Sequence, residues 1–416
     1  MKVNVLSCGV VMGLLACGDK DSDTGVDGSN DSGTSVAGMA FCAQIIDTFC
    51  YLSGEYTEDV LLTADYNYVL DGGVFIGDGT TENTLTIEPG VTIYGETSTK
   101  GFLTIRRNAN IEAVGTAEAP IVFTSPQAVG SRARSDWGGL IINGNAPINN
   151  CFDGEEQLPC EAEGEGGTGL YGGVDSADSS GTLKYVRVEF GGIEISTENE
   201  VNGIAFQGVG SGTTVDYIQV HMNKDDGVEF FGGTVNVSHV VLTGNGDDSF
   251  DVTDGWTGSA TDIYVEHIEG FESDRGFEMD NSGDQNDATP RSAPLISNVL
   301  VVGASTGDTG MLFREGLAGD FSNIHITGAE NCIDVDQDAT WAQVQAGNLT
   351  VSNAVFDCDN ITKNDDADEN PQDGIEDESF NASLEDWLIT ESGNTVGAVD
   401  ATPPAWTDGW IMTNAN

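Results

Sequence analysis

Residues 215–255 read VDYIQVHMNKDDGVEFFGGTVNVSHVVLTGNGDDSFDVTDG and contain two copies of one pattern. Ile218 and Val220 recur 22 residues later as Val240 and Leu242, and each copy holds two short alternating segments and two turns. Because equivalent positions recur in the same chain direction, such strands stack as parallel coils and do not close easily as hairpins. The sequence therefore predicts an all-β fold, a parallel β-helix in which each coil lies about 4.8 Å above the last.

The repeat continues on both sides of this stretch. Downstream, an apolar-Ser-Asn-apolar-x-apolar phrase begins at Ile296, Phe321 and Val351. Upstream, residues 85–93 read LTIEPGVTI and residues 120–125 read PIVFTS, with the same alternation. We therefore expect the solenoid to extend over most of the chain, because each coil buries its apolar faces only by stacking on its neighbours.

These motifs resemble known β-helix proteins. An IEPGVTI coil followed by a PIVFTS coil resembles right-handed parallel β-helix proteins of the pectin-lyase-like superfold. A closer resemblance, over about residues 85–305, is to secreted bacterial β-helix lipoproteins, whose function is largely unassigned. Four motifs carry it: WGGLIINGNAPI at 137–148, YGG at 171–173, YVRVEFGG at 185–192 and DDGVEFFGG at 225–233. The resemblance implies a right-handed helix and names no activity.

Composition limits the function. The 416 residues include 69 acidic and 14 basic side chains, for a net charge of -55. Such a surface cannot neutralise phosphates, which excludes a nucleic-acid partner. Hydrophobic residues still make up 38% of the chain, enough to bury a core despite the charge. The 55 glycines indicate many turns and argue against a helical bundle.

The first residues are typical of an exported protein. Residues 1–16 contain an apolar run too short to span a bilayer and are expected to be a signal peptide. The motif LLAC at 14–17 resembles the bacterial lipobox, which implies lipid attachment at Cys17. Gly18 follows where the inner-membrane retention signal usually has Asp, so we expect an outer-membrane or cell-surface location. Residues 17–38, rich in Gly, Ser and Asp, would form a flexible tether.

Beyond the tether we expect one elongated domain. The β-helix, with an N-terminal cap, is assigned to residues 39–378, including an acidic loop at 359–378. Residues 379–416 are expected to form a C-terminal cap, because the last coil would otherwise expose unpaired strand edges. We expect three tryptophans of this segment to cover the last coil: Trp387, Trp406 and Trp410.

Six cysteines remain after the signal peptide and Cys17, and an even number in an exported chain suggests three disulfides. Their spacing favours the pairs Cys42–Cys50, Cys151–Cys160 and Cys332–Cys358. The second pair would pin a loop at 149–181, which interrupts the repeat and is expected to protrude from the side of the helix.

Stacking would also collect carboxylates in a column. Glu229, Asp251 and Glu278 are middle residues of successive strands and should align, with Asp334 further along. Like charges at that spacing repel by about 1 kcal/mol in water and by several at an effective dielectric constant near 20. Either bound calcium or a solvated surface adapted to a salty medium can offset this repulsion, and the sequence leaves both open. The calcium ligands would be Asp226, Glu229, Asp248, Asp251 and Glu278.

An enzymatic alternative comes from the motif NKDDG at 223–227, which is followed by an Asp-Asp pair at 247–248. Together they resemble polygalacturonase-type glycoside hydrolases, which implies Asp226, Asp247 and Asp248 as acid and base carboxylates. A calcium-dependent lyase would instead hold calcium on Asp226 and Asp248 and use Arg275 or Lys224 as its base. The hydrolase family's Gly-His-Gly and Arg-x-Lys motifs are missing, since His267 stands in Glu-His-Ile and Arg275 has no lysine two residues later.

We therefore favour a non-catalytic surface module that is structural or binds a glycan or an extracellular-matrix component. Calcium is the cofactor it would use if the acidic column is a metal site. Its contact with the membrane would be through the lipid anchor only. The high negative charge would repel acidic polyuronates unless a cation intervened. A polysaccharide-active enzyme is the alternative.

Overall fold

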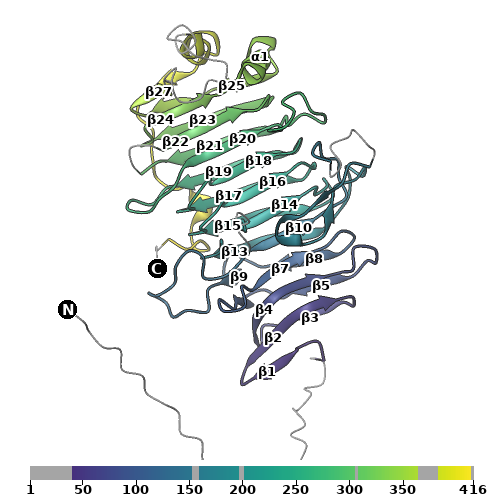
Figure 1. The fold of residues 1–416 in the computed structure, drawn as a ribbon. Coiled ribbons are helices and arrows are strands. Elements are labelled where there is room, and N and C mark those ends of the chain that lie inside the picture. The colour runs from purple at the N-terminus through teal and green to yellow at the C-terminus, as the bar shows by residue number, and fades with distance from the viewer. Residues whose placement is uncertain (1–39, 152–158, 196–200, 305–307, 364–382, 414–416) are drawn as a thin grey trace, which may run out of the picture.

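The computed structural model describes residues 40–151, 159–195, 201–304, 308–363 and 383–413. Its strands wind into a right-handed parallel β-helix, with one large sheet running through the coils (Figure 1). Among the described strands, only β1–β2 and β11–β12 pair antiparallel. The predicted fold class is confirmed. The signal peptide, Cys17, the tether and most of the acidic loop at 359–378 lie outside the described residues.

Two runs of strands form the faces that matter for the site. The long-strand run contains β13 (Gly181–Glu189), β15 (Thr214–His221), β17 (Asn236–Thr243), β19 (Ser259–Glu266), β21 (Leu295–Val302) and β23 (Gly319–Thr327). The short-strand run contains β7 (Phe102–Ile105), β10 (Leu140–Asn143), β14 (Ile204–Gln207), β16 (Val228–Phe231), β18 (Phe250–Thr253), β20 (Arg275–Asp280), β22 (Thr309–Arg314) and β24 (Asn331–Val335).

The two ends of the helix complete the architecture. The N-terminal coils contain β1 (Gln44–Ile46), β2 (Phe49–Tyr56), β3 (Val60–Leu62), β4 (Asn67–Ile76), β5 (Thr84–Ile87), β6 (Thr92–Gly95), β8 (Asn110–Val114) and β9 (Ile121–Thr124). The C-terminal end contains α1 (Asp338–Ala346), β25 (Leu349–Ser352), β26 (Val355–Asp357), β27 (Asn360–Thr362), η2 (Asp386–Glu391), β28 (Thr395–Val396) and η3 (Ala405–Thr407). Within the described residues, no helix has the length and apolar character needed to cross a bilayer.

The register follows the repeat seen in the sequence. Ile218 lies on Val240 and Val220 on Leu242, as the 22-residue offset predicts. Inside the short-strand run, four fully buried phenylalanines stack with ring centroids 5.0 Å apart at each step. They are Phe206, Phe230, Phe250 and Phe277. The core is thus a set of ladders, because every inward position meets its equivalent in the next coil.

A bend in each long strand explains the Ser-Asn phrase. Asn298, Asn323 and Asn353 have φ angles of 58°, 56° and 54°, a left-handed conformation that asparagine tolerates better than most residues. In earlier coils the same position holds ring side chains: Tyr185, Tyr217 and His239. These rings stack on the outside of the helix, with centroid separations of 4.4 and 4.0 Å.

The C-terminal segment differs from the expected cap. Trp387 does lie at the last coils, with its ring centroid 6.5 Å from that of Trp341. Trp406 and Trp410 lie much further back, with centroids 6.4 and 5.9 Å from that of Tyr217. In Figure 1 the yellow chain accordingly descends along the long-strand run toward β15. The stacked rings explain this path, because they offer an apolar surface that tryptophan can cover.

All three expected disulfides are present: Cys42–Cys50, Cys151–Cys160 and Cys332–Cys358. The second one lies in the insertion between β10 and β13, which also contains β11 (Ala162–Glu163), η1 (Glu165–Gly167) and β12 (Leu170–Tyr171). This insertion folds back against the helix, because Tyr171 packs with Ile148 and Phe231. The expectation of a protruding loop is therefore wrong for the described part of the insertion, which forms a wall beside the short-strand run.

Candidate functional site

The column of acidic residues predicted from the repeat lies along the short-strand run. Glu229 pairs in register with Asp251, and Asp251 with Glu278. The next coil places the uncharged Leu312 in the column, and the coil after that places Asp334 there. The alignment predicted from the repeat is confirmed, since parallel pairing stacks equivalent residues directly.

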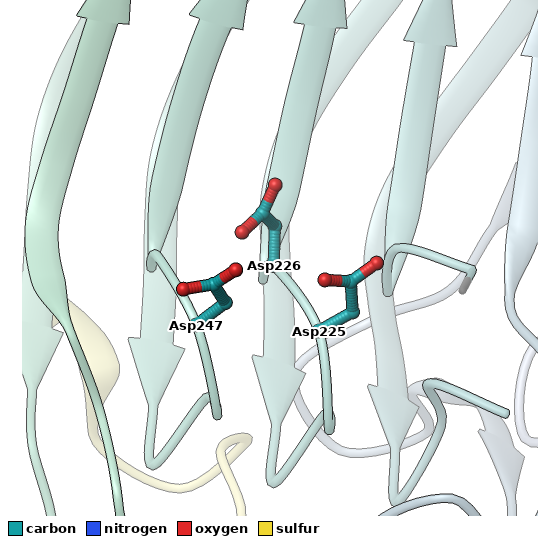
Figure 2. A group of neighbouring side chains, drawn as sticks. All are labelled: Asp225, Asp226 and Asp247. Atoms are coloured by element: carbon teal, nitrogen blue, oxygen red, sulfur yellow. The ribbon is translucent and has the colours of Figure 1, made fainter. Parts of the chain in front are cut away.

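More carboxylates lie on the turns before β16 and β18. Figure 2 shows Asp225 and Asp226 on one turn and Asp247 on the neighbouring turn. A carboxylate oxygen from each lies within 4.8 Å of the other two. Two further groups of this kind overlap with the first, and we call their combined members the acidic cluster: Asp225, Asp226, Glu229, Asp247, Asp248, Asp251 and Asp274.

Hydrogen bonds between coils hold these turns in place. Asp226 Oδ1 accepts a hydrogen bond of 2.9 Å from the backbone N–H of Asp248, its equivalent one coil later. The side chain of Asn223 donates to the carbonyl of Asp226 at 2.7 Å. The backbone N–H of Asn223 in turn donates to Asn245 Oδ1 at 3.2 Å. The repeat therefore positions the carboxylates through contacts between equivalent turns.

Two arginines neutralise one end of the cluster. Arg275 Nη1 contacts three carboxylates: Glu278 (2.6 Å), Asp274 (2.8 Å) and Asp248 (3.3 Å). Arg314 pairs with Glu278 as well, and with Asp280 at 2.9 Å. Glu278 was expected among the calcium ligands, but its charge is balanced by both arginines and it belongs to none of the three carboxylate groups. Both arginines thus pair with neighbouring carboxylates, the role that the sequence favours for them over contact with a substrate.

The other end is less well balanced: the charge of Arg314 lowers the pKa of Asp251, but burial outweighs this effect. Among the described residues, no lysine or arginine forms an ion pair with Asp226, Glu229 or Asp251, which together form the second carboxylate group. Asp226 and Glu229 are only 7% and 8% exposed. Burial first, and then the neighbouring carboxylates, raise the pKa of all three well above the ordinary range. Asp251 Oδ1 is buried without a hydrogen-bond partner.

The residues of the hydrolase alternative also meet here. Asp226 and Asp247 belong to one of the three groups of neighbouring carboxylates, and Asp247 and Asp248 belong to another. Arg275 lies 3.3 Å from Asp248. Burial raises the pKa of Asp248 to about 7, although Arg275 lowers it. The structure thus brings all four residues together.

A hollow of about 640 Å³ opens at the carboxyl ends of β14, β16 and β18. The insertion between β10 and β13 forms one wall, with Glu163, Glu165 and Tyr171. Strand ends and the segment after β20 form the rest. The other lining side chains are those of Asn150, Gln207, Phe231, Thr253, Asp254, Ser282 and Asp284.

The hollow and the acidic cluster share a hydrogen-bonded residue. Asn202 Nδ2 donates to Glu165 Oε2 at 3.3 Å and also to the carboxylate of Glu229. Burial and the charge of Asp225 raise the pKa of Glu165 to about 8. Within the hollow, Tyr171 donates a hydrogen bond of 3.1 Å to Asp254 Oδ2. Burial raises the pKa of Asp254 to about 6.

Sequence reasoning did not place the hollow. Its only sequence signal is the acidic glycine-rich run EAEGEGG at 161–167, which we expected on a protruding loop. That run supplies Glu163 and Glu165 to the hollow because the insertion folds back onto Phe231. No periodicity in the insertion could have indicated this contact.

Comparison with known proteins gives one match. A family model described as a pectate-lyase like beta helix domain matches residues 54–411. The matched region includes both strand runs, the acidic cluster and the hollow. Neither the curated proteins nor the solved structures contain a match to this chain.

Proposed function

The chain belongs to the family of pectate-lyase-like β-helix domains, and from this premise we propose that it is a calcium-loaded, non-catalytic module that binds glycans at the cell surface. One observation carries the proposal. Asp226, Glu229 and Asp251 bring carboxylate oxygens within 4.8 Å of one another at a place where no described arginine or lysine pairs with them.

The donor set suits calcium. Calcium takes about six to eight hard oxygen ligands and tolerates irregular geometry. The group Asp226, Glu229 and Asp251 offers such oxygens, with Asp225 and Asp247 beside it. Asp251 Oδ1 is buried and lacks a hydrogen-bond partner, so a cation there would satisfy it. A bound ion would supply the positive charge that balances these carboxylates.

Burial favours calcium over the alternative of a salt-adapted surface. Dissolved salt screens exposed charges efficiently and buried ones much less. Asp226 and Glu229 are nearly inaccessible, so solvent ions cannot relieve their repulsion. Their charges must be removed by protonation or balanced by an ion held in place.

The surface location and the ligand class are parts of the same proposal. Three disulfides support an exported protein, because such bonds persist in oxidising compartments. The LLAC motif supports lipid attachment at Cys17. The hollow supports a glycan, because it combines aromatic walls at Phe231 and Tyr171 with several polar side chains.

Calcium should stabilise the mature protein measurably. At a free concentration about 100 times the Kd, binding should add about 2.7 kcal/mol to the free energy of unfolding. Asp251→Asn should lose most of this gain, because it removes a ligand charge. Asp334→Asn, in the same column but paired with Lys363 at 3.1 Å, should keep the gain. Denaturant titrations in EDTA and in calcium measure both. Identical unfolding curves for the wild-type protein would contradict the proposal.

Cleavage of a polysaccharide is the second candidate, and Asp248 favours it. A carboxyl with a pKa of about 7 beside an arginine suits an acid–base catalyst. Our expectation is that the protein releases neither reducing ends nor unsaturated products from a panel of polysaccharides. Product release that Asp248→Asn abolishes would instead establish the enzyme.

A further inference from the structure

We infer that the hollow beside the acidic cluster recognises a glycan whose sugars carry free, positively charged amino groups. This inference rests on the proposed glycan-binding function and names the ligand class. It starts from the charge of the hollow, which is lined by the acidic side chains of Glu163, Asp254 and Asp284 and contains no lysine, arginine or histidine in its described lining. Glu165 adds a fourth carboxyl group, which is charged only above its raised pKa of about 8. A ligand with positive charge is the natural complement of such a wall.

A buried and unpartnered amide points independently to a ligand. Gln207, the last residue of β14, lines the hollow and is 0% exposed. Neither its Oε1 nor its Nε2 has a hydrogen-bond partner in the described structure. Leaving such an amide unsatisfied costs about 1–3 kcal/mol, so a polar ligand that supplies a donor and an acceptor would relieve it.

The remaining walls favour a sugar over a simple ion. The ring of Phe231 meets that of Tyr171 edge to face, with centroids 6.2 Å apart, and provides an apolar wall. Such aromatic surface is of no use to a bare metal ion, but it suits the apolar face of a pyranose or an organic ammonium group. Hydroxyl and amide groups of Asn150, Thr253 and Ser282 can bind sugar hydroxyls.

Asp254 is the best-positioned partner for an ammonium group. Its Oδ2 accepts hydrogen bonds from Tyr171 at 3.1 Å and from Asn150 at 3.4 Å, which hold the carboxylate in place. Among the described residues, no hydrogen bond to its Oδ1 is present. The volume of about 640 Å³ is within the range of roughly 300–1,000 Å³ typical of ligand sites, so a short oligosaccharide fits.

The test uses calcium-loaded mature protein and a matched pair of probes: the trisaccharide of β-1,4-linked glucosamine and its fully N-acetylated counterpart. Calorimetry at a pH above the pKa of Asp254, about 6, and below that of the sugar amine should show binding of the amine form and binding weaker by roughly tenfold or more for the acetylated form. Asp254→Asn should lower the affinity for the amine form by a similar factor. Asp262→Asn, which removes one charge from the long-strand run, should leave it unchanged.

A second variant separates binding from folding. Gln207→Met should weaken binding by roughly tenfold while leaving the melting temperature unchanged or higher, because it replaces an unsatisfied amide with an apolar group of similar size. Weak binding together with a lowered melting temperature would assign Gln207 a structural role and would overturn its part in recognition.

Three outcomes would overturn the inference. The first is equal affinity for the amine and the acetylated sugars, and the second is no binding of either sugar. The third is a lysine-rich peptide that binds as tightly as the amine sugar and whose binding Asp254→Asn also weakens. The calcium-induced stabilisation is measured on the same samples. If calcium stabilises the protein and the amine sugar does not bind, the ligand assignment fails and the calcium proposal stands. If the amine sugar binds and calcium has no effect, the ligand assignment stands and the calcium proposal fails.

Discussion

In calcium-free buffer, the protein should become less stable as the pH rises from about 4 to about 8. The pKa of Asp248 in the folded protein is about 7 and that of Glu165 about 8, against ordinary values of 3.8 and 4.5. Between the ordinary and the raised values, the folded state therefore holds more protons than the unfolded state. By linkage, the stability is fully present below the ordinary pKa and is lost as the pH rises through the folded pKa.

The expected loss is large. One pKa unit corresponds to about 1.4 kcal/mol, so the shift of Asp248 alone represents on the order of 4 kcal/mol. Urea titrations in EDTA at several pH values measure this loss. Added calcium should flatten the profile, because metal and protons compete for the same carboxylates. Asp248→Asn should reduce the slope, and Asp262→Asn serves as the control for a lost charge elsewhere.

A stability that rises steadily between pH 5 and pH 8 in EDTA would contradict this account. It would mean that the carboxylates of the acidic cluster are already compensated within the folded chain. The calcium proposal would then lose its physical basis, which is uncompensated negative charge.

Phe250→Ala should lower the free energy of unfolding by about 3–5 kcal/mol. Phe250 is fully buried and stacks between Phe230 and Phe277, with centroids 5.0 Å from each. Its removal leaves a cavity in the middle of the ladder, which neighbouring coils cannot close without breaking their own register. Urea unfolding of the wild-type and variant proteins measures the difference.

Phe271→Ala is the matched control. Phe271 is 41% exposed and contacts the guanidinium of Arg134, with 5.3 Å between the group and the ring centroid. Loss of that contact should cost about 1 kcal/mol or less. If both variants lower the free energy of unfolding by the same amount, the buried phenylalanine ladder contributes no more to stability than this exposed ring contact.

The acidic cluster and the hollow lie close enough to act together. Asn202 donates hydrogen bonds to Glu165 in the hollow and to Glu229 in the cluster. A cation that draws Glu229 toward itself would also affect the Asn202 bond to Glu165. Measuring the calcium affinity with and without the glycan, and the glycan affinity with and without calcium, would therefore reveal any coupling between the two sites. By thermodynamic necessity, each ligand must change the affinity for the other by the same factor.

The coils, their register and the acidic column could be derived from the sequence alone. Equivalent residues that recur in the same chain direction favour parallel coils, and parallel pairing then stacks Glu229, Asp251 and Glu278. The three disulfides could also be predicted, since each joins two cysteines that are consecutive in the sequence.

Only the tertiary structure decided which carboxylates are balanced and where the hollow lies. Arg275 and Arg314 stand on different coils, and whether their long side chains reach Glu278 depends on side-chain conformation, not on the repeat. The insertion that carries Glu165 and the segment that carries Trp410 have no periodicity. Their positions are set by the surfaces they cover, and such contacts between segments far apart in the chain leave no local pattern in the sequence.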